Sequence, residues 1–184
     1  MRQQREIPAD EWQYRERSSN EIRTILLELA LEFVRGVRAC PGIARIGLIG
    51  SVVTPKPRPK DIDLLVSATP DLEMPRLAKL GRRLKGSAQA RLTSGADVFL
   101  ADPSGRYLGR ICHYRECHPR VLCRARRCGA VPHLADDLDV VSISTDLIAT
   151  PPIELWPEVI VRVDVPDDVE QLLLAPLRSE GAPL

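Results

Sequence analysis

The stretch that decides the fold of this 184-residue chain reads ARIGLIGSVVTPKPRPKDIDLLV and spans residues 44–66. Its largely apolar beginning, residues 44–49, predicts a β-strand, and the prolines that follow exclude a regular helix from the connecting loop. A second strand over residues 61–66 would place Asp61 and Asp63 on one face, because side chains alternate along a strand. Two carboxylates held this close usually have shifted pKa values or bind a cation, and a divalent ion that prefers oxygen ligands suits them.

Hydrophobic periodicity predicts the elements around this stretch. Apolar residues at helical spacing indicate a helix over residues 20–34, with Ser19 or Asn20 as its N-cap. The other expected elements are a basic helix over residues 71–85 that opens near Pro75, strands over 96–101 and 138–143, a proline-rich connection over 150–157, and a strand and a short helix opened by Asp167-Asp168 within 159–174. This order predicts an α/β (α+β) domain in which a mixed sheet is flanked by helices.

Length and composition limit the organisation of the chain. One domain with an appendage suits 184 residues. We assign residues 1–104 to the core, residues 105–135 to a Cys-, His- and Arg-rich insertion or appendage, and residues 136–184 to a strand and helix that complete the domain. The net charge of +1 argues against strong non-specific binding to nucleic acid. No apolar run approaches the ~20 residues that span a bilayer, and no signal peptide is evident, so we expect a cytoplasmic protein without a membrane partner.

The pair of aspartates lies next to features that suit nucleotidyl transfer. This reaction needs a hydroxyl and a pyrophosphate leaving group held in line, with divalent ions that neutralise the phosphate charge. Gly50 has no side chain to keep backbone N–H groups away from a triphosphate, and Ser51 adds a hydroxyl. Asp97, in a later predicted strand, could direct a third carboxylate at the same ions and help to deprotonate the acceptor.

Gly50-Ser51, the Asp61-Ile62-Asp63 strand and Asp97 together resemble the nucleotidyltransferase superfamily of DNA polymerase β, in particular the minimal nucleotidyltransferases. The resemblance covers roughly residues 20–102. It implies a mixed sheet with flanking helices and Mg²⁺-dependent transfer of a nucleoside monophosphate from an NTP to a hydroxyl of a small molecule, protein or RNA. The glycine and serine would then contact the phosphates, the aspartate pair would ligate Mg²⁺, and Asp97 would be the third carboxylate.

Two further assignments concern residues around this constellation. Lys56 and Lys60, in the proline-rich loop, are candidate contacts to the triphosphate. Asp139 is the alternative to Asp97 as the third carboxylate, and Asp97 is preferred because it follows the second strand by one helix. An ordinary turn followed by two solvated aspartates at a strand edge is the simpler explanation of the same residues.

A second cluster, of cysteines, lies further along the chain. Cys112, Cys117, Cys123 and Cys128 are separated by four, five and four residues, and His113, His118 and His133 lie nearby. Four thiolates, or three with one imidazole, could form a closed tetrahedral Zn²⁺ site that stabilises this arginine-rich segment. Free thiols, buried or partly exposed, are the alternative.

The arginines of this segment, with Tyr107, Tyr114 and His118, could bind phosphate and stack on bases. The alternative to an enzyme is therefore a non-catalytic, zinc-stabilised module that binds nucleic acid or protein on a nucleotidyltransferase scaffold.

Overall fold

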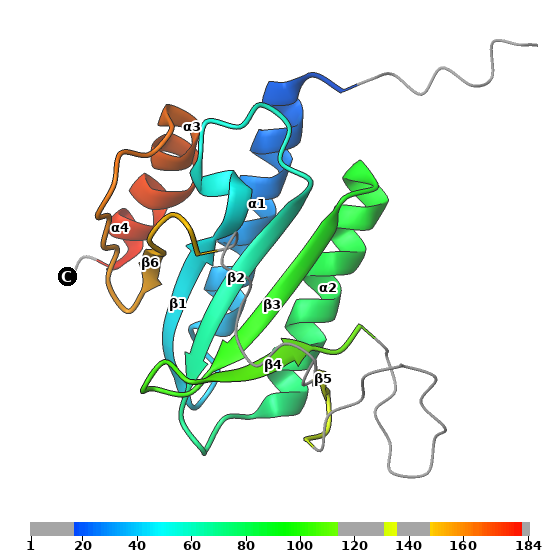
Figure 1. Ribbon diagram of the computed structural model, residues 1–184, viewed down its shortest axis with the longest axis vertical. Helices are drawn as coiled ribbons and strands as arrows, with labels where there is room; N and C mark the ends of the chain where they lie inside the picture. Colours follow the sequence, from blue (N-terminus) through cyan, green and yellow to red (C-terminus); the bar gives the residue numbers. More distant parts are fainter. Residues whose placement is uncertain (1–16, 114–130, 136–147, 182–184) are drawn as a thin grey trace, which may run out of the picture.

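The computed structural model describes residues 17–113, 131–135 and 148–181 of the chain (Figure 1). The elements are α1 (Ser19–Val37), β1 (Ile43–Ile49), a 3₁₀ turn (Gly50–Val53), β2 (Asp61–Ala68), α2 (Met74–Leu92), β3 (Gly95–Ala101), β4 (Tyr107–Ile111), β5 (Leu134–Ala135), β6 (Ile153–Trp156), and a C-terminal helical segment made of α3 (Asp167–Val169), a π-helical turn (Glu170–Leu174) and α4 (Ala175–Gly181). The prediction of a mixed α/β domain is confirmed.

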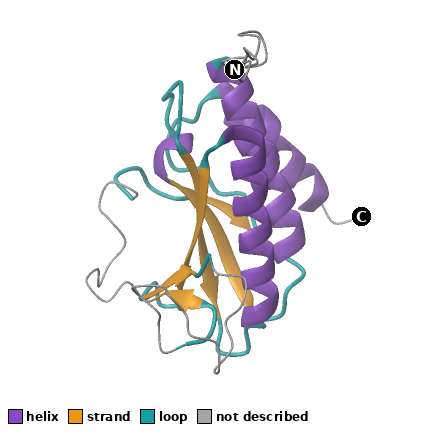
Figure 2. Ribbon diagram, turned by 90° about the vertical axis from the view of Figure 1, so that its right-hand side faces the viewer, coloured by secondary structure: helices purple, strands orange, loops and turns teal. Residues whose placement is uncertain are grey.

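The strands form one six-stranded mixed sheet in the order β5-β4-β3-β2-β1-β6. β2 and β3 run parallel and are joined through α2, whereas the other neighbouring strands of the sheet are antiparallel. The helices α1 and α2 lie against one face of this sheet, and the C-terminal helical segment packs on α1 (Figure 2). Within the described ranges, no long helix covers the opposite face.

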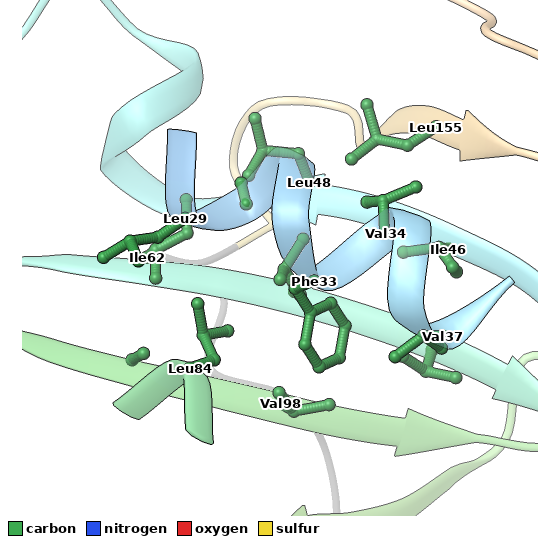
Figure 3. Close-up of a cluster of buried hydrophobic side chains, with 14 of the residues drawn as sticks. Leu29, Phe33, Val34, Val37, Ile46, Leu48, Ile62, Leu84, Val98 and Leu155 are labelled. Atoms are coloured by element: carbon green, nitrogen blue, oxygen red, sulfur yellow. The ribbon is translucent and has the colours of Figure 1, made fainter. Parts of the chain in front are cut away.

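The packed side of the sheet follows from side-chain alternation. In β2, Ile62, Leu64 and Val66 are fully buried beneath the helices. Figure 3 shows Phe33 of α1 directed at these strands, close to Val98 of β3. Full burial of one such side chain contributes roughly 1.5–3 kcal/mol, so the alternation itself decides which face of β2 meets the helices. The alternate residues Asp61, Asp63 and Leu65 must face the other way.

Helix α1 begins one residue earlier than the sequence suggests. Ser18 is the N-cap, and it forms a capping box with Glu21: the Ser18 hydroxyl accepts from the Glu21 N–H at 3.2 Å, and the Glu21 carboxylate accepts from the Ser18 N–H at 2.8 Å. The predicted N-cap, Ser19 or Asn20, is therefore wrong by one or two positions.

Helix α2 has Pro75 in its first turn, as predicted, but it continues seven residues past the predicted end at 85. It ends at Thr93, whose φ of +56° is left-handed.

Strands β6 and β4 lie where the sequence predicts a connection and an appendage. The proline-rich connection over 150–157 contains strand β6, because Pro151, Pro152 and Pro157 flank the four pairing residues rather than interrupt them. β4, within the range assigned to an appendage, pairs with β3 and extends the sheet beyond residue 104.

The C-terminal helical segment opens at Asp167, as predicted, whereas the strand expected before it is reduced to one bridge between Glu154 and Ile160. The strand predicted over 138–143 lies outside the described residues. In the described ranges, no helix combines the length and apolar character needed to cross a membrane.

Candidate functional site

The three predicted carboxylates come together on the open face of the sheet. Asp63 of β2 is the register partner of Asp97 of β3, and Asp61 is the partner of Gly95. Parallel neighbours in register lie about 4.8 Å apart and direct their side chains to the same face. The Gly95 N–H donates to the Asp61 carboxylate at 2.8 Å and fixes its orientation.

Asp63 is the most buried of these carboxylates. It is 7% exposed, and no described residue forms an ion pair with it. Burial, followed by the nearby carboxylates of Asp97 and Asp61, raises the pKa of Asp63 from 3.8 to about 7. A buried carboxylate with two anionic neighbours is the environment that a bound cation would stabilise.

Gly50 is required by its contact with Asp63. The glycine has a φ of +78°, and a Cβ at this position would lie 2.5 Å from Oδ2 of Asp63. Its neighbour Ile49 pairs with Asp63 across β1 and β2, so the 3₁₀ turn with half-buried Ser51 begins directly beside that carboxylate. The structure therefore brings the predicted glycine-serine turn and the aspartates together.

Asp97 has different surroundings from Asp63. Arg110 Nη1 lies 3.4 Å from its Oδ2, and His113 Nε2 and Lys85 Nζ lie 2.9 and 3.8 Å from its Oδ1. Burial and the positive charge of Lys85 lower the pKa of His113, which favours a neutral imidazole near pH 7. Asp97 thus faces basic groups from both α2 and β4.

Sequence reasoning missed these three basic partners of Asp97. Arg110 belongs to the arginine-rich segment, His113 lies beside the proposed zinc ligands, and Lys85 ends the predicted basic helix over 71–85. The sequence shows only that basic residues are frequent both before and after the Asp97 strand. Their frequency does not reveal which of these residues reach the Asp97 carboxylate.

Arg23 holds the loop that carries Gly50-Ser51. It is 6% exposed, and its guanidinium donates to the carbonyls of Val52, Thr54 and Lys56 at 2.9–3.0 Å. It also forms a two-pronged ion pair with Asp168 of α3. These contacts tie α1, the loop and the C-terminal helical segment together.

Sequence reasoning also missed the role of Arg23, although a signal exists. Position 23 lies on the same helical stripe as Leu26, Leu27 and Ala30, all fully buried. A charged residue within an apolar stripe is a candidate for a buried pairing.

The positions of the remaining predicted residues give less support to their predicted roles. Lys56 and Lys60 are exposed in the loop, and the Lys56 carbonyl, rather than its ammonium, makes the contact to Arg23. Cys112 is buried at the end of β4. The other three proposed zinc ligands, with His118 and Asp139, lie outside the described residues, so the zinc site remains a prediction.

The donor set suits Mg²⁺ held jointly with substrate. Within the described ranges, no three His, Cys, Asp or Glu side chains cluster tightly enough to hold a metal ion by themselves. Mg²⁺ commonly takes one or two protein carboxylates and completes its shell with water and substrate phosphates. Asp61 and the buried Asp63, which has no ion-pair partner among the described residues, meet that requirement.

Comparison with protein-family models, with curated proteins and with solved structures gave no match. The function has to be inferred from the chemistry of the site.

Proposed function

We propose that this protein is a Mg²⁺-dependent nucleotidyltransferase that moves a nucleoside monophosphate from an NTP to a hydroxyl acceptor. The observation that carries the proposal is the register of Asp63 with Asp97 on one sheet face, two residues from Asp61, beside a glycine turn that leaves no room for a Cβ against Asp63. Burying a charged group without a compensating charge is costly, so an ordinary strand edge would not be expected to bury a carboxylate beside two others.

In this proposal each residue of the site has a separate role. Asp61 and Asp63 would hold Mg²⁺, which would neutralise charge on the phosphate oxygens. The turn at Gly50-Ser51 presents backbone N–H groups and a hydroxyl to the triphosphate.

Asp97 accepts the proton of the acceptor hydroxyl, and Arg110 orients its carboxylate. The acceptor oxygen forms a bond to the α-phosphorus as the bond to the β-phosphate oxygen breaks, and pyrophosphate leaves.

Incubation with each α-labelled NTP and Mg²⁺, followed by separation of labelled protein, RNA and small molecules, tests the proposal. Label transfer should fall at least ~100-fold in Asp61→Asn and Asp63→Asn, because the stabilisation supplied by a bound metal is worth several kcal/mol. Asp164→Asn is the matched control, since it makes the same change at an exposed aspartate away from the sheet face.

Nucleotide binding and transfer that are unaffected by the first two substitutions would overturn the assignment of the aspartates. Absence of both nucleotide binding and transfer would favour the non-catalytic binding module instead.

A further inference from the structure

A small basic cavity lies beyond Asp97, between α2 and the edge of the sheet. Its volume is about 190 Å³. The polar part of its lining is Arg82, Lys85, Gln89 and His113, and its floor includes Val98 and Ile111. Lys85 and His113 are also the groups that contact Asp97, so the cavity borders the carboxylate site.

Basic side chains line the cavity. None of the described residues that line it is acidic, and Lys85 Nζ lies 3.2 Å from His113 Nε2. Arg82 reaches across from α2 to the Cys112 carbonyl at 3.5 Å, which directs its guanidinium over the cavity. Arg82 also lines a shallower neighbouring hollow together with Lys79 and Arg83, so the basic surface continues outward along α2.

We propose that this cavity binds a phosphate group of a phosphate ester. A guanidinium offers paired donors to phosphate oxygens, and an ammonium adds a compact positive charge. Ligand pockets that enclose a whole small molecule usually measure about 300–1,000 Å³, so a cavity of about 190 Å³ suits one group of a larger ligand.

The position of the cavity indicates which substrate would carry that phosphate. Gly50-Ser51 follows β1, whereas the cavity lies on the β4 side of the aspartates, under α2, and meets the carboxylate face at the strand edge where Lys85 and His113 contact Asp97. If the proposed function holds, the NTP lies at the Gly50-Ser51 turn and the phosphate in the cavity belongs to the acceptor. This last step rests on the proposed function, but phosphate binding does not.

Calorimetric titration with inorganic phosphate in EDTA at pH 7 tests the site without metal or nucleotide. Lys85→Gln and Arg82→Gln should each weaken phosphate binding about tenfold or more, because charged hydrogen bonds contribute roughly 1.5–3 kcal/mol. Arg91→Gln is the matched control: it removes the same charge from the same helix, where Arg91 pairs with Glu28 of α1.

Gly86 provides a test that leaves the basic residues intact. It lines the cavity, and a Cβ there meets nothing within 4 Å, so substitutions at this helical position fit without a clash. Gly86→Glu should abolish phosphate binding by repulsion, whereas Gly86→Ala should retain it. No phosphate binding by the unchanged protein, or equal binding by Gly86→Glu and Gly86→Ala, would overturn the proposal.

Two probes distinguish the source of the phosphate. Ribose 5-phosphate presents a monoester, and a short oligoribonucleotide without terminal phosphates presents diesters. Lys85-dependent binding of either supports the site and identifies its class, and failure of both overturns it. Asp63→Asn should keep phosphate binding, so loss of nucleotidyl transfer in that variant and loss of phosphate binding in Lys85→Gln report on separate claims.

Discussion

Asp63 and Asp97 face each other across β2 and β3, yet their surroundings are opposite. Asp63 is buried beside other carboxylates, and no described residue forms an ion pair with it, whereas Asp97 contacts Arg110, His113 and Lys85. The protein therefore supplies cations of its own to Asp97, whereas Mg²⁺ would supply the positive charge beside Asp63 if the proposed function holds. Identical side chains on one sheet face have different electrostatic roles because their neighbours come from different elements.

The largest expected effect is an opposite response to neutralisation at pH 8 in EDTA. Asp63→Asn should stabilise the fold by up to about 4 kcal/mol, because it removes the cost of ionising Asp63 in the folded state. A rise in the pKa of Asp63 from 3.8 to about 7 corresponds to that cost at ~1.4 kcal/mol per tenfold change in proton affinity. Asp97→Asn should destabilise it by about 1–3 kcal/mol, because Lys85 and Arg110 lose their anionic partner.

Urea denaturation at two pH values checks this pair of variants. The folded state holds the Asp63 proton more tightly than the unfolded chain, so the unchanged protein loses stability as pH rises from about 4 to about 7 and no further above that. The advantage of Asp63→Asn should therefore shrink at pH 5. Destabilisation by both variants at pH 8 would remove the contrast between the two carboxylates.

The next effect concerns the close approach of Gly50 to Asp63. Gly50→Ala should lower the free energy of unfolding by roughly 2–3 kcal/mol. A left-handed φ costs alanine ~1 kcal/mol or more, and the new Cβ would also lie 2.5 Å from Oδ2 of Asp63. Gly105→Ala isolates the backbone cost, since Gly105 has a φ of +88° with nothing within 4 Å.

Chemical denaturation of the two alanine variants measures the difference. Combining Gly50→Ala with Asp63→Ala should recover the part due to the clash. Equal costs at positions 50 and 105 would show that the carboxylate does not press on the turn.

Mg²⁺ should produce a smaller, selective stabilisation. At a concentration ten times the dissociation constant, Mg²⁺ should stabilise the protein by about 1.4 kcal/mol at pH 8. Thermal unfolding should show this shift in Asp97→Asn but not in Asp63→Asn. A shift that survives the loss of Asp63 would place the ion elsewhere.

The smallest expected effect concerns Arg110, whose positive charge acts on both Asp63 and Asp97. Its charge lowers the pKa of Asp63 as well as pairing with Asp97. Arg110→Gln should raise the pKa of Asp63 further, so the pH midpoint of Mg²⁺-induced stabilisation should move upward by less than about one pH unit. An unchanged or lower midpoint would mean that Arg110 acts on Asp97 alone.

Sequence periodicity predicted the shared face of Asp61 and Asp63, because alternation is a local property of one strand. It also identified the Asp97 strand, but the register that sets Asp97 beside Asp63 depends on how α2 packs and cannot be obtained from a period of two. The basic partners of Asp97 come from α2 and β4, and only tertiary structure reveals which charges meet.

Strand β6 was missed for a different reason. Prolines usually mark connections, but here they bound a short edge strand that needs only four residues. The sequence pattern alone does not distinguish prolines that flank a strand from prolines that replace one.

The contacts of Arg23 have a consequence for the order in which the site is assembled. The guanidinium belongs to the first helix, but its carboxylate partner, Asp168, lies 145 residues later. During synthesis, the Gly50-Ser51 loop and all three aspartates leave the ribosome well before that partner does. The loop therefore reaches its final anchoring late, after β6 and the start of the C-terminal helical segment have been made. A nascent chain can form the carboxylate face of the sheet before the Gly50-Ser51 loop has all of its anchoring contacts.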